Sequence, residues 1–162
     1  MRGARLSNVP AVTDWSIRRA ERADLDDLLV LMRGYCDFYE VSPPDEDLLA
    51  IACALLDDPE HEGVQLIARD RTGGAIGFAT VYWSWSTTAA CRIGVMNDLF
   101  VAQAARGQGL ADELIQACRA ECAQRGARQL TWQTAPDNLR AQAVYDRVGA
   151  TREQWVDYWL PC

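Results

Sequence analysis

The chain has 162 residues, of which 49% are hydrophobic and 24% charged, and its formal net charge is −7. This length suits one domain with a core of its own, and the composition excludes a largely disordered chain. The negative charge argues against a nucleic-acid binder, because such proteins neutralise phosphates with basic side chains.

Residues 1–14 are small and polar, with no apolar period and no apolar core of a secretory signal. No stretch of the chain approaches the ~18 apolar residues that a membrane span requires. We therefore expect a flexible tail over residues 1–14, a single domain over residues 15–162, a cytoplasmic location and no membrane partner.

Hydrophobic periodicity predicts the elements in chain order. A strand over Trp15–Ala20 is followed by a helix that starts at Asp24, a residue type that favours the N-cap, and ends before the prolines of Ser42–Pro44. A second helix stops near Asp58. The next three predicted strands, joined by hairpin turns, are Gln65–Asp70, Ala75–Trp85 and Ile93–Val101.

The second half of the chain alternates helices with single strands. Helices are predicted over Gly109–Arg125 and Asn138–Val148, and strands over Leu130–Thr134 and Trp155–Leu160. Hairpins in the middle of the chain with helical crossovers on either side predict an α/β fold of the α+β kind, a mixed sheet covered by helices.

Six cysteines and one histidine, His61, could suggest a zinc or disulfide site. However, Cys118 and Cys122 lie one helical turn apart among apolar positions, and no Cys-x-x-Cys pair exists. Metal sites usually use such pairs together with histidines. We expect buried reduced thiols and no metal.

Nine acidic residues and no arginine lie between Asp37 and Glu62. They could form a solvated helical face. They could also form an electrostatic funnel, because a cleft lined by one sign of charge concentrates its counter-ion, here a cationic substrate.

The most informative segment is the loop Arg106–Ala111, which joins the strand ending at Val101 to a helix. The free N–H groups and the dipole of a helix N-terminus attract anions, and Arg106 adds a donor suited to phosphate. Gly107 and Gly109 would let the backbone approach phosphate oxygens. A P-loop is excluded because the chain has no lysine, and a dinucleotide fingerprint fails because Asp112 occupies its third glycine position.

The pattern Arg-x-x-Gly-x-Ala of this loop resembles the signature of the GNAT acetyltransferase superfamily. The later block 132–150 is similar to a second family motif, in which Asn138 and Tyr145 lie two helical turns apart on one face. The resemblance covers about residues 15–160. It implies a GNAT-like acyl-CoA N-acyltransferase fold, a central twisted mixed sheet flanked by helices.

The resemblance also implies acetyl-CoA as co-substrate, with its pyrophosphate on the loop amides and its pantetheine arm along the preceding strand. The cofactor-binding residues that it implies are Leu99, Phe100, Val101, Arg106, Gly107, Gln108, Gly109, Leu110, Ala111, Asp112, Asn138 and Tyr145.

Acetyl transfer from a thioester to an amine requires that the amine lose a proton, that the tetrahedral oxyanion be stabilised and that the leaving thiolate be protonated. By the resemblance, Tyr145 is the general acid and a strand N–H near Leu99 holds the oxyanion. Two carboxylates stay open as the base: Asp98, on the strand, and Glu40, which follows Tyr39 where the first helix ends.

A narrower similarity, to the spermidine/spermine and related diamine acetyltransferases, rests on Phe38–Glu40, Gly77–Ala79 and the aromatic run Tyr82–Trp85. Those enzymes carry a Glu-Asp pair where this chain has Asn97 and Asp98. The residues expected to contact the acceptor are Tyr39, Glu40, Trp83, Trp85, Asn97, Asp98 and Trp132.

We therefore expect direct transfer of an acetyl group to the primary amine of a small cationic acceptor: a diamine, a polyamine or an amino-acid-like compound. The alternatives are a protein or peptide acetyltransferase, a non-catalytic acyl-CoA-binding module and a generic nucleotide-binding domain. The resemblance also implies a homodimer.

Overall fold

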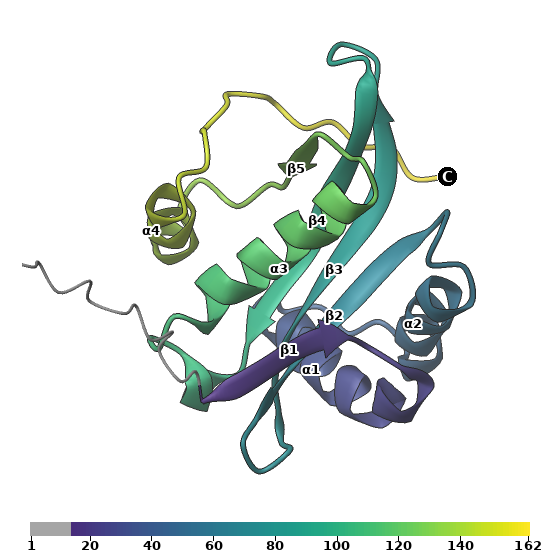
Figure 1. Ribbon diagram of the computed structural model, residues 1–162, viewed down its shortest axis with the longest axis vertical. Coiled ribbons are helices and arrows are strands. Elements are labelled where there is room, and N and C mark those ends of the chain that lie inside the picture. The colour runs from purple at the N-terminus through teal and green to yellow at the C-terminus, as the bar shows by residue number, and fades with distance from the viewer. Residues whose placement is uncertain (1–13) are drawn as a thin grey trace, which may run out of the picture.

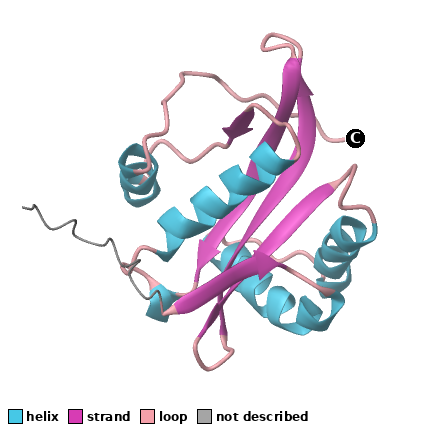
Figure 2. Ribbon diagram, in the orientation of Figure 1, coloured by secondary structure: helices cyan, strands magenta, loops and turns pink. Residues whose placement is uncertain are grey.

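The computed structural model describes residues 14–162, and the expected tail lies outside this range apart from Asp14. Five strands form one sheet in the order β1-β2-β3-β4-β5, with helices on both faces (Figures 1 and 2). The elements are β1 Trp15–Arg19, η1 Arg22–Asp24, α1 Leu25–Phe38, α2 Asp45–Asp57, β2 Gly63–Asp70, β3 Ala75–Ser86, β4 Cys91–Val101, η2 Gln103–Ala105, α3 Leu110–Gln124, β5 Gln129–Thr131 and α4 Leu139–Arg147.

The sheet is mixed, which confirms the predicted fold class. Strands β1 to β4 pair antiparallel, and β4 pairs with β5 in parallel. Two parallel neighbours need a crossover, and α3 provides it between β4 and β5.

Alternate residues of the sheet pack into two cores. Phe78 of β3 is fully buried against residues of α1, whereas its neighbour Ala79 is fully buried on the face that carries α3. This alternation follows from the two-residue period of a strand and explains the long apolar runs of β2 and β3, which are covered on both faces.

Two irregularities of β4 shape the site. The register pairs Thr80 with Asp98 but Val81 with Met96, so Asn97 is an extra residue that forms a β-bulge. On the other edge, β5 pairs only with Ile93–Val95. The edge of β4 beyond Val95 therefore has no neighbouring strand within residues 14–162.

Helix α1 ends at Phe38 with Tyr39 as its C-cap, before the prolines, as the sequence predicts. Two other predicted features are wrong or altered. Asp24 stands at the N-cap position of α1 but makes no side-chain cap, because its carboxylate binds Arg18 instead. The strand predicted at Trp155–Leu160 does not form: this segment has no regular structure and is exposed, since no strand of the described chain pairs with it.

The cysteines of the described chain are free, and four of them, including Cys118 and Cys122, are buried. Burial raises the thiol pKa to about 12 for Cys118 and about 11 for Cys122. Residues 14–162 contain no group of three or more side chains suited to hold a metal. Within the same range, no helix combines the length and apolar character needed to cross a bilayer.

Candidate active site

The glycine loop adopts the conformation that the sequence predicts at the start of α3. Gly107 and Gly109 have φ of 79° and 95°, in the left-handed region, and a Cβ at either position would meet no atom within 4 Å. The Glu113 N–H donates to the Gly109 carbonyl at 3.2 Å. The N–H groups that precede Glu113 in the first turn have no helical carbonyl ahead of them, so an anion can accept their hydrogen bonds.

Arg106 is anchored beside this loop. Its Nε donates to the carbonyl of Val101 at 2.8 Å, and its guanidinium lies 5.7 Å from the centre of the Phe100 ring. No ion pair within residues 14–162 involves Arg106. Its positive charge is therefore fixed next to the loop and available to a phosphate.

The side chains of three other predicted loop residues make contacts within the protein. Asp112 forms an ion pair with Arg147 at 2.8 Å, which ties α3 to α4. The Gln108 amide donates back to the Ala104 carbonyl at 3.3 Å, and the Leu110 side chain is buried in the core. Leu110 and Asp112 can therefore serve an anion through their backbone N–H groups.

The exposed edge of β4 runs from the bulge to the loop. Leu99 and Val101 pack toward the α3 face, whereas Phe100 packs toward α1. An unpaired strand edge offers N–H and C=O groups to an extended ligand, as in strand addition. The edge and the loop together can hold a long ligand that ends in phosphates.

Asp98 faces α1 and lies in a network of polar groups. The Asn97 amide donates to Asp98 Oδ1 at 3.0 Å. Burial raises the pKa of the Asp98 carboxyl, and the polar side chains of Thr80, Asn97 and Tyr35 beside it partly oppose that rise. A carboxylate with a raised pKa is a better proton acceptor near neutral pH.

Thr80 extends this network along the α1 side of the sheet. Gln65 Nε2 donates to Thr80 Oγ1 at 3.2 Å, and both side chains are buried. A hydroxyl has one proton, so Thr80 accepts from Gln65 and donates to Asp98. This arrangement orients the carboxylate.

Tyr35 was not among the site residues predicted from the sequence. Its hydroxyl donates to the Asn97 carbonyl at 3.4 Å, and its ring lies 5.0 Å from that of Tyr39. Burial and the nearby Asp98 raise its pKa. The spacing of Tyr35 and Tyr39, one helical turn, is the signal that could have found it.

Tyr145 is partly buried on α4, with its ring 5.2 Å from that of Trp132 in an edge-on contact. Burial and the proximity of Tyr39 raise the pKa of Tyr145, while a hydrogen bond with Thr134 acts in the opposite direction. Tyr145 therefore keeps its proton at neutral pH. Tyr145 also contributes to the raised pKa of Tyr35. The tyrosine of α4 therefore lies in the same neighbourhood as Tyr35 of α1 and Asp98.

Asn138 has a structural role that the motif did not reveal. It is the N-cap of α4, and its Oδ1 accepts a hydrogen bond from the Ala141 N–H at 3.1 Å. This cap sets the start of the helix that carries Tyr145.

The two carboxylates left open as base lie in different environments. Glu40 is exposed in the turn after α1, with φ of +57°, and no ion pair within the described range involves it. Asp98 is partly buried, accepts a hydrogen bond from the Asn97 amide and lies beside the Thr80 and Tyr35 hydroxyls. Tyr39, next to Glu40, is half exposed.

The strand tryptophans lie away from this cluster. Trp83 is buried, its Nε1 donates to the Pro59 carbonyl at 2.9 Å, and Arg125 covers its ring. Trp85 is 69% exposed and stacks with Arg92. It is five residues along β3 from Thr80, about 16 Å at the rise of a strand. Neither tryptophan is brought to Asp98.

The acidic segment is partly neutralised by arginines from other elements. Asp45, Asp57 and Glu60 pair with arginines, and Asp58 makes a local contact with the His61 ring at 2.8 Å. The remaining acids of this segment have no ion pair within residues 14–162; they are Asp37, Glu40, Glu46, Asp47 and Glu62. The field at the end of α1 is weaker than nine free carboxylates would produce.

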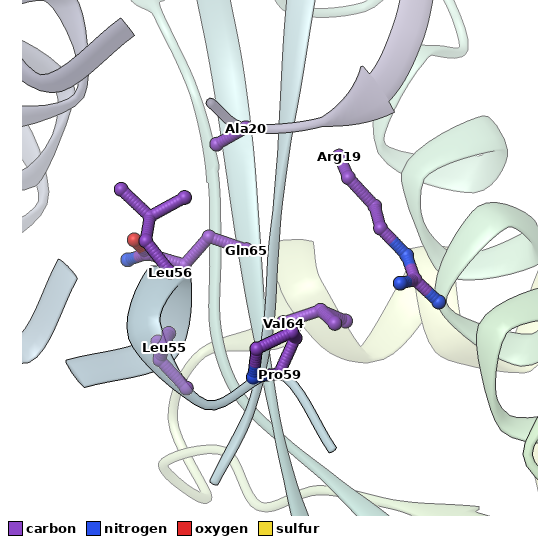
Figure 3. Close-up of a pocket in the computed structure, with 7 residues that line it drawn as sticks. All are labelled: Arg19, Ala20, Leu55, Leu56, Pro59, Val64 and Gln65. Carbon is purple, nitrogen blue, oxygen red and sulfur yellow. The ribbon is translucent and has the colours of Figure 1, made fainter. Parts of the chain in front are cut away.

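A cavity of about 120 Å³ lies between α2 and the first strands (Figure 3). Its lining residues are Arg19, Ala20, Leu55, Leu56, Pro59, Val64 and Gln65. None of them belongs to the predicted site.

Comparison with known proteins identifies the family. Residues 28–150 match the model described as Acetyltransferase (GNAT) family. The chain is 34% identical over 146 residues to the uncharacterized N-acetyltransferase YhfO of Bacillus subtilis, with 90% of this chain and 96% of YhfO covered. It is 28% identical over 118 residues to the D-amino-acid N-acetyltransferase HPA3 of Saccharomyces cerevisiae, with 73% of each covered.

Among solved structures, the aminoglycoside N-acetyltransferase AAC(6')-Iy in complex with CoA matches with a TM-score of 0.81 at 25% identity, over 95% of this chain and 99% of that one. The matched family range includes the bulge, the glycine loop and Tyr145. The chain therefore belongs to the Acetyltransferase (GNAT) family and is an acetyl-CoA-dependent N-acetyltransferase.

Proposed function

We propose that the protein transfers the acetyl group directly to the primary amine of a small, cationic acceptor. The observation that carries this proposal is the position of Asp98. Its partly buried carboxylate, with a raised pKa, lies at the bulge beside the open edge of β4. A cationic amine would be both attracted and deprotonated there.

Acetyl-CoA, when bound, supplies the thioester. The loop amides and Arg106 hold its phosphates, and the β4 edge at Leu99 and Val101 aligns its pantetheine arm. Asp98 accepts the proton that the ammonium group must lose before its nitrogen can attack. As the new carbon–nitrogen bond forms and the carbon–sulfur bond breaks, Tyr145 donates its proton to the departing sulfur.

The acceptor class is proposed at the level of a small amine. Diamines, polyamines and amino-acid-like compounds fit a site with one partly buried carboxylate. The names of two relatives add D-amino acids and aminoglycosides to the panel. We further propose a homodimer and a cytoplasmic location, which sedimentation and cell fractionation test.

The testing experiment measures release of free CoA thiol with diamines, polyamines, D-amino acids, aminoglycosides and basic peptides. Amine-dependent release should fall about 10²-fold or more in Tyr145→Phe, a typical contribution of a general acid. The matched control is Tyr158→Phe, since the Tyr158 side chain is 92% exposed. Its rate should equal that of the unmodified protein.

The proposal fails if only the peptides are acetylated, because a protein acetyltransferase is then the better description. It also fails if no acceptor stimulates thiol release while acetyl-CoA binds.

A further inference from the structure

Helix α4 carries Tyr145 but is only shallowly embedded in the protein. None of its nine residues, all within the described range, is buried, and the helix lies at the periphery of the molecule beyond α3 (Figure 1). Val144, Tyr145 and the C-cap residue Val148 are partly buried against the core under α3. Apolar burial stabilises a helix in its place in proportion to the area removed from water. Polar contacts must therefore contribute to the position of α4.

A bidentate ion pair joins Arg147 of α4 to Asp112 of α3. Arg147 Nη2 donates to the two Asp112 carboxylate oxygens at 2.8 and 3.0 Å, and Nε donates to one of them at 3.1 Å. A guanidinium that meets a carboxylate through two nitrogens fixes orientation as well as distance. The Asp112 side chain is 27% exposed, so solvent screens the pair only in part. The pair therefore constrains how α4 can turn against α3.

Both charges lie at helix ends that favour them. Asp112 is in the first turn of α3, where the helix dipole favours an anion, and Arg147 is in the last turn of α4, where it favours a cation. The Asp112 backbone N–H belongs to the turn that can bind phosphate. One residue thus offers its backbone to the phosphates of acetyl-CoA and its side chain to the helix that carries Tyr145.

The ion pair and Tyr145 lie on different sides of α4. Residues two apart are separated by about 200° around a helix, so Arg147 and Tyr145 leave α4 in nearly opposite directions. The Tyr145 ring lies 5.2 Å from that of Trp132. A rotation of α4 by ~10° would displace an atom ~6 Å from the helix axis by about 1 Å. A displacement of this size at a reacting group can cost ~10²-fold in rate.

We propose that Asp112 and Arg147 form a positioning pair, which fixes α4 against the phosphate-binding turn of α3 and thereby holds the Tyr145 hydroxyl at the departing sulfur. The inference rests on the general-acid role of Tyr145 proposed above. In this role the two side chains bind each other and not the reacting atoms. Loss of the pair lowers kcat, because Tyr145 is correctly placed for a smaller fraction of the time, while the loop amides still bind phosphate.

The first test separates kcat from KM. Asp112→Asn keeps the backbone N–H and removes the charge, and Arg147→Gln removes the guanidinium. Each should lower kcat at saturating acetyl-CoA about three- to fivefold, the size expected for a partly exposed ion pair. The double variant should lower kcat no further, because either change alone breaks the pair. Its net charge equals that of the unmodified protein, so KM for acetyl-CoA should not change.

The matched control is Arg152→Gln. Arg152 pairs with Asp146 of α4 at 3.3 Å, its side chain is 62% exposed, and it makes no ion pair with α3 within residues 14–162. Its removal takes one arginine from the surroundings of the same helix without touching the contact between α3 and α4. The kcat of this variant should equal that of the unmodified protein.

Ionic strength gives a readout that a role in apolar packing would not change. Salt raised from about 0.05 to 0.5 M screens an exposed pair. The kcat of the unmodified protein at saturating acetyl-CoA should therefore decline toward that of the double variant, whose own kcat should stay constant. Arg147→Lys keeps the charge but not the planar fork, and its kcat should lie between those two values.

Hydrogen exchange tests the pair independently of catalysis. The amides of Leu139–Arg147 should exchange faster in Arg147→Gln than in the unmodified protein or in Arg152→Gln, since fewer contacts hold the helix. A second comparison ties the pair to Tyr145. When Arg147→Gln is added to Tyr145→Phe, kcat should fall no further, because the hydroxyl that the pair positions is already absent.

The possible failures are distinguishable. Unchanged kcat in both single variants, or effects that multiply in the double variant, would overturn the proposal. A raised KM for acetyl-CoA in Arg147→Gln with constant kcat would make Arg147 a phosphate ligand instead. Full activity in Tyr145→Phe would refute the general acid itself and with it the positioning role. The exchange data would then decide separately whether the pair anchors α4.

Discussion

Asp98 of β4 lies opposite Thr80 of β3, immediately beside the β-bulge at Asn97. In a regular strand Met96 and Asp98 would share a face, because side chains alternate with a period of two. The extra residue breaks this alternation: Met96 packs in the core under α3, whereas Asp98 reaches Thr80 and Tyr35 on the opposite face. The bulge therefore directs the Asp98 side chain away from the core under α3 and into the site.

Asp98→Asn should lower kcat/KM about 10²-fold or more at neutral pH, because the acceptor amine loses its base. Activity should recover at high pH, where the free amine is deprotonated by the solvent. The matched variant is Glu40→Gln, at an exposed position, which should change kcat/KM by less than about threefold. The measurement is the pH profile of kcat/KM for both. A larger loss in Glu40→Gln would assign the base to Glu40 instead.

Thr80→Val should move the pH profile without removing the base. The Thr80 hydroxyl lowers the pKa of Asp98, so its loss raises that pKa further. Since Asp98 acts in its deprotonated form, the acid limb of kcat/KM should shift to higher pH. Thr80→Ser retains the hydroxyl and should restore the original limb.

The same Thr80→Val substitution leaves Gln65 Nε2 with only the weak acceptor Met32 Sδ at 3.8 Å and should destabilise the protein by about 1–3 kcal/mol. KM for acetyl-CoA should not change, because Thr80 lies on the α1 side of the sheet, away from the loop. An unshifted limb with the same loss of stability would reduce Thr80 to a structural role.

Much of the fold could be predicted because its elements have clear apolar periods. The bulge could not, since an extra residue in β4 is visible only in its register with β3. Tyr35 was missed because its role depends on α1 crossing beside Asn97. Trp83 looked like a substrate contact because of the aromatic run Tyr82–Trp85, but its indole N–H donates to the Pro59 carbonyl.

The wrong strand at Trp155–Leu160 has a different cause. Its alternation is real, but a strand forms only against a partner, and the three residues of β5 do not pair with it in one chain. The motif marked Asn138 as a ligand contact, and the structure adds a second role, because its side-chain oxygen caps α4. Sequence patterns identify residue types and spacing, and tertiary contacts decide their use.

Gly109→Ala should raise KM for acetyl-CoA about tenfold. With φ of 95° at this position, an alanine costs about 1–2 kcal/mol, and relaxation would move the first amides of α3. The control is Gly126→Ala, at the other end of α3, where φ is 74°. It should lose a similar stability with KM unchanged. Equal KM values in both variants would contradict a phosphate site at the loop.

Asp24→Asn should lower the free energy of unfolding at neutral pH by about 2 kcal/mol. The carboxylate is 2% exposed and accepts from Arg18 at 2.6 and 2.8 Å and from Arg69 at 2.7 Å. This is less than the ~3–5 kcal/mol of a broken, fully buried pair, because Arg18 is 44% exposed and its charge can be resolvated.

The effect of Asp24 should depend on pH. The hydrogen bond from Arg18 holds the pKa of Asp24 well below its usual range, against the opposing effect of burial. A depressed pKa stabilises the fold above the unfolded value, near ~3.9, and this stabilisation is lost as pH falls below it. Urea unfolding at pH 7 and pH 3 should therefore show the difference between the unmodified protein and Asp24→Asn shrinking in acid.

The control for Asp24 is Asp57→Asn, whose pair with Arg22 is exposed on both sides, at 59% and 65%. It should cost less than about 1 kcal/mol at either pH, since solvent screens exposed pairs. Two results would contradict the assignment of Asp24 as the group that anchors α1 to β1 and β2. One is equal destabilisation of both variants, and the other is a difference in free energy of unfolding between the unmodified protein and Asp24→Asn that does not change with pH.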